Sequence, residues 1–95
     1  MWVTVAISKA MEYKEADNNY RCRIFEFPPA SQYAGKRFAH PRKLIVDLAY
    51  GVYGLKVADT WEFHVTDGDK GEIRIADIGL EQLLKEFGEE AFLIE

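Results

Sequence analysis

The sequence predicts one α+β domain over residues 1–95, with a mainly antiparallel sheet of about five strands packed against one or two helices. Three observations support this class. Several segments alternate apolar and polar residues with a period of two, as half-buried strands do. One segment near the carboxyl end instead repeats its leucines at helical spacing. With 95 residues, 48% of them hydrophobic, the chain is long enough for one core and too short for two.

The first two strands are predicted in the amino-terminal part of the chain. Residues 2–8 alternate in the strand period. Residues 20–27 do the same, with Cys22 and Ile24 on one face and the arginines and phenylalanines on the other. The connection over residues 9–19 is either a short helical turn or a long hairpin link, with asparagines suited to a turn.

The middle of the chain is open to two interpretations. Pro28 and Pro29 end the second strand, because proline cannot donate a backbone hydrogen bond to a sheet. After a loop, residues 41–53 place apolar side chains at helical spacing, behind a proline that suits a first helical turn. A helix is the preferred prediction. The same residues are also rich enough in Ile, Val and Tyr for a strand, with Gly51 and Gly54 then marking a turn.

The carboxyl-terminal third shows the clearest pattern. Residues 60–77 alternate on both sides of the turn segment DGDKG, which predicts a β-hairpin. Asp77 is expected to cap a helix whose leucine stripe faces the core, and Gly88 is expected to end it. The last segment, residues 89–95, is nearly continuously apolar after its two glutamates. It is predicted to be a strand covered on both faces.

Charge is distributed unevenly along the chain. Residues 59–95 hold eleven acidic and three basic side chains, a net charge of −8, whereas residues 1–58 hold nine basic and five acidic ones, a net charge of +4. The whole chain therefore carries −4. The segment KRFAHPRK, residues 36–43, holds four of the twelve lysines and arginines. This pattern predicts a surface that attracts a negatively charged partner.

The basic region, residues 20–43, supplies the candidate binding site. Folding of the loop over the outward face of the second strand would bring its cations onto one surface. Tyr33, Phe38 and His40 are interleaved with them as expected stacking partners, because such side chains stack on the bases of single-stranded nucleic acids. The competing interpretation is that these cations pair with the acidic half of the protein or of a second copy. The candidate binding residues are Arg21, Arg23, Lys36, Arg37, Phe38, His40, Arg42 and Lys43.

No catalytic or metal-binding pattern stands out. Cys22 is the only cysteine, and the strand pattern predicts a buried thiol there. His40 and His64 lie far apart, so the spacing of a zinc site is missing. The segment beginning at Asp67 starts like a calcium loop, yet Ile78 stands where the final glutamate ligand belongs. We therefore expect a protein that is not an enzyme and that binds no metal or cofactor.

These features favour one function and leave one alternative. The preferred function is a small non-enzymatic interaction module of the accessory or inhibitor type. It would bind a protein partner or a second copy of itself through a charge-polarised surface and exposed strand edges. The apolar carboxyl-terminal strand could pair with a second copy across a two-fold axis. The alternative is a nucleic-acid-binding domain that uses the basic patch of residues 21–43. No run approaches the roughly 18 apolar residues of a membrane span, and a single cysteine is unusual for small secreted domains, so a cytoplasmic location is expected.

Overall fold

The computed structural model describes residues 1–14, 21–67 and 73–94 as two four-stranded antiparallel sheets with one α-helix and three short 3₁₀ helices. In chain order the elements are β1 (Trp2–Ser8), η1 (Lys9–Met11), β2 (Cys22–Glu26), β3 (Arg37–Pro41), η2 (Arg42–Leu44), β4 (Ile45–Ala49), β5 (Val52–Ala58), β6 (Phe63–Thr66), β7 (Arg74–Ile78), α1 (Leu80–Phe87), η3 (Gly88–Glu90) and β8 (Ala91–Ile94). The predicted α+β class and antiparallel pairing are confirmed.

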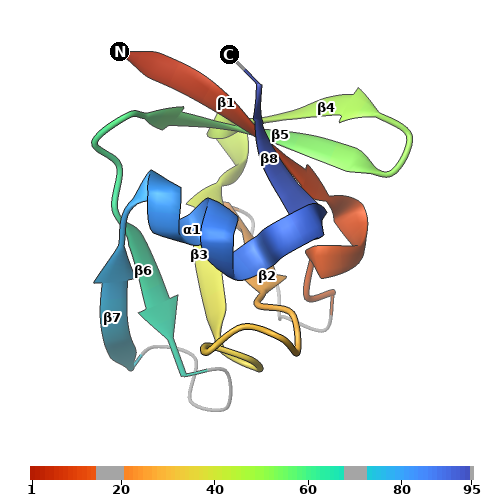
Figure 1. Ribbon diagram of the computed structural model, residues 1–95. Coiled ribbons are helices and arrows are strands. Elements are labelled where there is room, and N and C mark those ends of the chain that lie inside the picture. Colours follow the sequence, from red (N-terminus) through yellow and green to blue (C-terminus); the bar gives the residue numbers. More distant parts are fainter. Residues whose placement is uncertain (15–20, 68–72, 95) are drawn as a thin grey trace.

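The strands are divided between two sheets instead of forming a single one. Sheet A has the order β4-β5-β1-β8, and sheet B has the order β2-β3-β6-β7. In Figure 1 sheet A forms the upper part of the molecule and sheet B the lower part, while α1 crosses in front of them. Two such sheets, each apolar on its inner face, bury that face against each other and against the helix.

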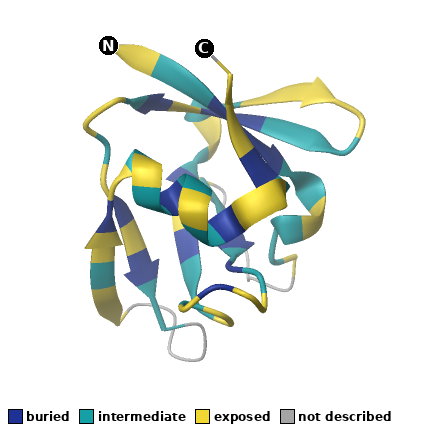
Figure 2. Ribbon diagram, in the orientation of Figure 1, coloured by how far each residue is buried: buried dark blue, intermediate teal, exposed yellow. Residues whose placement is uncertain are grey.

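The hydrophobic core lies between the two sheets and is largely aromatic. Phe38 of β3 is fully buried, and its ring lies 5.2–5.8 Å from the rings of four other phenylalanines. Sheet A contributes aliphatic side chains such as Val5 and Ile7 from β1, and α1 contributes Leu83. Figure 2 shows buried segments in strands of both sheets and in α1. The core therefore joins both sheets and the helix into one unit.

The helix preferred for residues 41–53 is wrong, and the alternative strand prediction is closer to the structure. Strands β4 and β5 form an antiparallel hairpin, preceded by the short η2 helix. Gly51 lies at the turn with φ of +83°, a conformation that glycine adopts without strain. Gly54 lies within β5 instead of at the turn. The β-branched residues of this segment fit a pleated sheet better than a helix, which explains the outcome.

The predicted hairpin of residues 60–77 is confirmed as β6 and β7, with Phe63 opposite Ile78. Most of its DGDKG turn lies outside the described residues. Asp77 does not cap α1, because it lies within β7 and accepts a hydrogen bond from His64; Gly79 occupies the N-cap position. Gly88 ends the helix with a positive φ, as predicted. Within the described ranges, no helix combines the length and apolar character of a membrane span.

The prediction that the last strand is covered on both faces is wrong. Strand β8 pairs only with β1 among the described strands and forms one edge of sheet A. Phe92, Leu93 and Ile94 expose 58%, 46% and 37% of their surface. A continuously apolar run resembles a central strand in sequence, but no further strand within the described residues covers it.

Candidate binding surface

The outer face of sheet A carries a row of apolar residues contributed by all four strands. The strand registers place Ala6 of β1 between Phe92 of β8 and Gly54 of β5, and they place Val46 of β4 beyond Gly54. Cross-strand partners lie on the same face of a sheet, and the residues of β1 that belong to the core, Val5 and Ile7, have the opposite parity to Ala6, which is buried beneath its neighbours. The row therefore points away from the core.

Two further side chains widen this row. Leu48, at the irregularity of β4, lies over Gly54, since a Cβ atom added at Gly54 would come within 2.9 Å of the Leu48 Cγ atom. Ile94 shares the face of Phe92, two residues along β8. Val46 and Leu48 expose 38% and 42% of their surface. We call the exposed residues Val46, Leu48, Phe92 and Ile94 the outer apolar face.

Strand β8 also differs from the three other edge strands. Strand β4 contains Asp47 and an irregular register, β2 contains Arg23 and Glu26, and β7 contains Arg74 and Asp77. Strand β8 reads AFLI and contains no charged residue. Charges and bulges on edge strands protect proteins from pairing with other chains. β8 lacks both devices and is thus the edge best suited to accept another strand.

A groove of about 560 Å³ opens on the inner side of sheet A beside β8. Leu93 of β8 and Leu80 and Leu84 of α1 supply its apolar lining. Two carboxylates, Asp59 and Glu81, stand at its border. Its complete lining is Asp59, Gly79, Leu80, Glu81, Gln82, Leu84 and Leu93. Apolar floors with a few charged groups are typical of binding sites.

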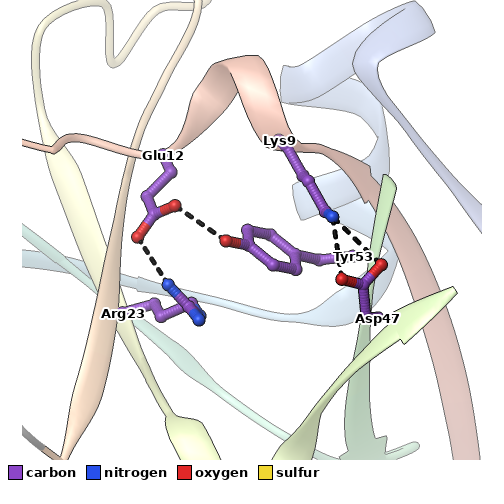
Figure 3. Close-up of polar contacts among 5 residues, drawn as sticks. All are labelled: Lys9, Glu12, Arg23, Asp47 and Tyr53. Carbon is purple, nitrogen blue, oxygen red and sulfur yellow. Dashed lines mark hydrogen bonds and ion pairs between the residues drawn. The ribbon is translucent and has the colours of Figure 1, made fainter. Parts of the chain in front are cut away.

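A second cluster, drawn in Figure 3, is polar and lies where η1 meets both sheets. Glu12 accepts hydrogen bonds from the Tyr53 hydroxyl (2.9 Å) and from Arg23 Nη1 (3.0 Å). Lys9 Nζ binds both carboxylate oxygens of Asp47, at 2.9 and 3.0 Å. The Tyr53 ring lies between the two cations, 4.7 Å from the Arg23 guanidinium carbon and 5.1 Å from Lys9 Nζ.

The electrostatics of this cluster favour a structural role. Burial and the neighbouring Glu12 carboxylate raise the pKa of the Tyr53 phenol, so it stays protonated and donates its hydrogen bond. Each charged side chain already faces an opposite charge of the same cluster. The contacts connect η1 and the residue that follows it, Glu12, with β2, β4 and β5. Arg23, a predicted binding residue, is thus held in an internal ion pair.

Two other predicted binding residues belong to the interior. Phe38 and His40 are fully buried on the inner side of β3, so the expectation that they stack on a bound base is wrong. His40 Nε2 lies 3.0 Å from the Lys56 carbonyl oxygen, to which its N–H donates. Burial lowers the pKa of His40 and keeps the ring neutral. Phe38 and His40 alternate along β3 on its buried face. The sequence did not indicate this, because charged residues precede and follow the strand.

The remaining predicted cations fall into two groups at opposite ends of the β2–β3 pair. Lys36 and Arg37 lie at one end, where Arg37 is opposite Glu26 and its guanidinium carbon lies 3.5 Å from the Tyr13 ring centroid. Arg21, Arg42 and Lys43 are exposed at the other end, and the Arg42 backbone N–H donates to the Arg21 carbonyl. The four residues from Phe38 to Pro41 separate Arg37 from Arg42, so the groups lie about 16–17 Å apart along the strand.

Comparison with known proteins found no matching family model, no curated relative and no similar solved structure. In the described part of the chain, no group of three or more metal-binding side chains occurs. The predicted site residues include none of the outer apolar face, although the apolar carboxyl-terminal strand was expected to be able to pair with a second copy. The outer apolar face itself draws on strands β4 and β8, which are distant in sequence, so no local pattern could have indicated it.

Proposed function

We propose that this protein is a non-enzymatic interaction module that binds another protein through the outer apolar face and the adjoining edge strand β8. The observation that carries this proposal is the exposure of large apolar side chains together on one face of sheet A, next to an uncharged edge. Contiguous exposed apolar residues beside polar ones commonly mark protein-binding surfaces. Burial of such residues against a partner lowers the free energy of the system and so stabilises the complex.

Charge contributes to this proposal, although differently from the sequence-based expectation. The segment from α1 to η3 carries Glu81, Glu86, Glu89 and Glu90 but only one cation, Lys85. Of these carboxylates, Glu81 lines the groove next to β8, together with Asp59. An acidic border steers a partner of opposite charge and discourages unrelated acidic proteins. The charge-polarised surface is thus proposed to attract a basic partner, with apolar contacts supplying most of the affinity.

Nucleic-acid binding remains a second candidate because Arg21, Arg42 and Lys43 are exposed and adjacent at one end of β2–β3. Three phosphate contacts would give a weak, strongly salt-dependent association, and two of the predicted stacking residues are buried. Oligonucleotide binding at two salt concentrations tests this candidate. The candidate would be supported if the logarithm of the wild-type affinity falls by about 2–3 for each tenfold rise in salt. The variant Arg42→Ala/Lys43→Ala should then bind more weakly than wild type.

The proposed protein-binding function is tested by capture from a lysate of the source cells. The immobilised wild-type domain is compared with the double variant Phe92→Ser/Ile94→Ser, which removes half of the outer apolar face. The matched control is Ile75→Ser on β7, an apolar residue of comparable exposure on sheet B. We expect a protein that wild type and control retain and that the double variant loses by at least tenfold.

Each capture result is interpreted with a folding check by circular dichroism. Retention of the same proteins by all three domains would contradict the proposal, and so would loss by the β7 variant alone. The substituted side chains are only partly exposed, so each replacement should lower the free energy of unfolding by about 1–2 kcal/mol. A folded double variant therefore makes a loss of capture attributable to the surface.

A further inference from the structure

We propose that strand β8 receives an extended segment of the partner protein as a fifth strand of sheet A, and that this segment combines apolar residues with flanking lysines or arginines. This inference rests on the proposed function and specifies its ligand. It draws on three independent features of the described residues. These are the polar backbone edge of β8, the apolar surfaces on both sides of that edge, and the acidic border.

The backbone of β8 supplies the first feature. On its inner flank β8 pairs with β1 over four residues, from Ile7↔Ala91 to Thr4↔Ile94. The outer flank of an edge strand presents its remaining N–H and C=O groups to solvent, and an extended peptide can satisfy them by strand addition. β8 contains no charged residue, unlike the three other edge strands, and it lacks the irregular register found at β4 and β7. Strand addition is therefore favoured here over the other edges.

The side chains beside this edge supply the second feature. Successive side chains of an added strand point to opposite faces of the sheet. One set would lie beside Phe92 and Ile94 on the outer apolar face. The other set would lie beside Leu93, on the side of the groove that Leu80 and Leu84 line. Both sets of the incoming side chains therefore meet apolar surface, so the central residues of the ligand should be apolar on both faces.

Charge supplies the third feature and distinguishes a basic partner segment from a second copy of this chain. Asp59 and Glu81 border the groove, and Glu89 and Glu90 directly precede β8. A second copy would bring the same acidic surroundings to the edge, and each copy carries a net charge of −4. Like charges across an added strand are unfavourable, whereas lysine or arginine would pair with these carboxylates. A basic segment is thus the better occupant.

The test uses the whole domain labelled with nitrogen-15 and blocked heptapeptides of defined sequence. The first peptide is Lys-Lys-Val-Leu-Val-Lys-Lys, and its counterpart is Glu-Glu-Val-Leu-Val-Glu-Glu. A third peptide repeats the first with the backbone nitrogens of its three central residues methylated, which blocks strand pairing on both edges. We expect the basic peptide to shift the amide resonances of β8 and the groove, and to bind at least tenfold more tightly than either of the others.

A double variant and a control test whether the carboxylates of the groove cause the preference for a basic peptide. The double variant Asp59→Lys/Glu81→Lys should lower the affinity for the basic peptide at least tenfold, while the control Glu62→Lys, an exposed carboxylate outside the groove, should leave it within twofold. Resonance shifts confined to sheet B, equal affinity for the basic and acidic peptides, or no effect of N-methylation would overturn the inference. So would a dimer of the unliganded domain in sedimentation that Leu93→Lys dissociates.

The peptide experiment and the capture experiment can give different outcomes, which distinguish the strand-addition inference from the proposed function. If the basic peptide does not bind but Phe92→Ser/Ile94→Ser still abolishes capture of a cellular protein, the interaction function holds and its strand-addition mode is wrong. If the peptide binds while the double variant captures the same proteins as wild type, the proposed function is wrong.

Discussion

Two phenylalanines show how differently this fold uses the same side chain. Phe38 lies at the centre of the aromatic core, in contact with four other phenylalanine rings, and is inaccessible to water. Phe92 lies on the outer face of sheet A with more than half of its surface exposed. The interior therefore accounts for most of the stability, whereas apolar residues of the outer face add less to it. Exposed apolar surface of this kind is expected to be retained for binding.

The largest expected effect sharpens this comparison directly. Phe38→Ala should lower the free energy of unfolding by about 3–5 kcal/mol, because it leaves a cavity among four aromatic rings. Phe92→Ala should lower it by about 1–2 kcal/mol, because more than half of this side chain is already exposed. Urea denaturation followed by tryptophan fluorescence measures both. Equal losses in the two variants would mean that the outer face is part of the stabilising core after all.

An intermediate effect concerns pH and a buried group of the interior. Burial lowers the pKa of His40, so the unfolded chain binds a proton more readily than the folded one. Stability should fall as pH decreases below the ordinary histidine pKa of about 6.5, by at most about 1.4 kcal/mol per pH unit, until the folded-state pKa is reached.

Denaturation curves from pH 7.5 to 5 measure this slope in wild type and in His40→Gln. The slope should shrink in His40→Gln and persist in His64→Gln, which alters the exposed histidine of β6. If the slope is lost only in His64→Gln, His40 does not cause the pH dependence of stability.

The smallest expected effect concerns the attachment of α1 to the loop after β2. Glu86 accepts hydrogen bonds from Ser31 Oγ (2.6 Å) and from the Gln32 backbone (3.2 Å) and side chain (2.6 Å), which hold the pKa of this carboxyl below its usual value. Glu86→Gln should cost about 1 kcal/mol at pH 7. The loss should fade in acid, as the wild-type carboxyl becomes protonated. Glu81→Gln on the same helix is the control, and an equal cost there would refute a specific role for Glu86.

Local patterns predicted much of the fold. The hairpin of residues 60–77 and the helix ending at Gly88 follow from alternation, helical spacing and turn chemistry, all of which act over a few residues. The β4–β5 hairpin was mistaken for a helix because residues 41–53 satisfy both periods. Pairing with β1, a contact distant in sequence, decides between them. The division into two sheets depends on the same long-range pairing.

The candidate site was less predictable than the fold. Net charge along the sequence indicated the basic region, yet Arg23 pairs internally with Glu12 and His40 is buried. The outer apolar face combines residues from strands β4 and β8, which are brought together only by the order of sheet A. Its one local signal was the uncharged run AFLI. That run was interpreted as a central strand because sequence does not show which strands lie at an edge.

The claim that sheet A binds the partner at β8 is tested most directly by amide hydrogen exchange of the domain, alone and with the captured partner. The amides of Ala91–Ile94 should exchange at least tenfold more slowly in the complex, while those of Arg74–Ile78 on the edge of sheet B stay unchanged. Protection confined to residues 21–23 and 41–44, with β8 unaffected, would contradict the claim and place the partner at the basic end of β2–β3.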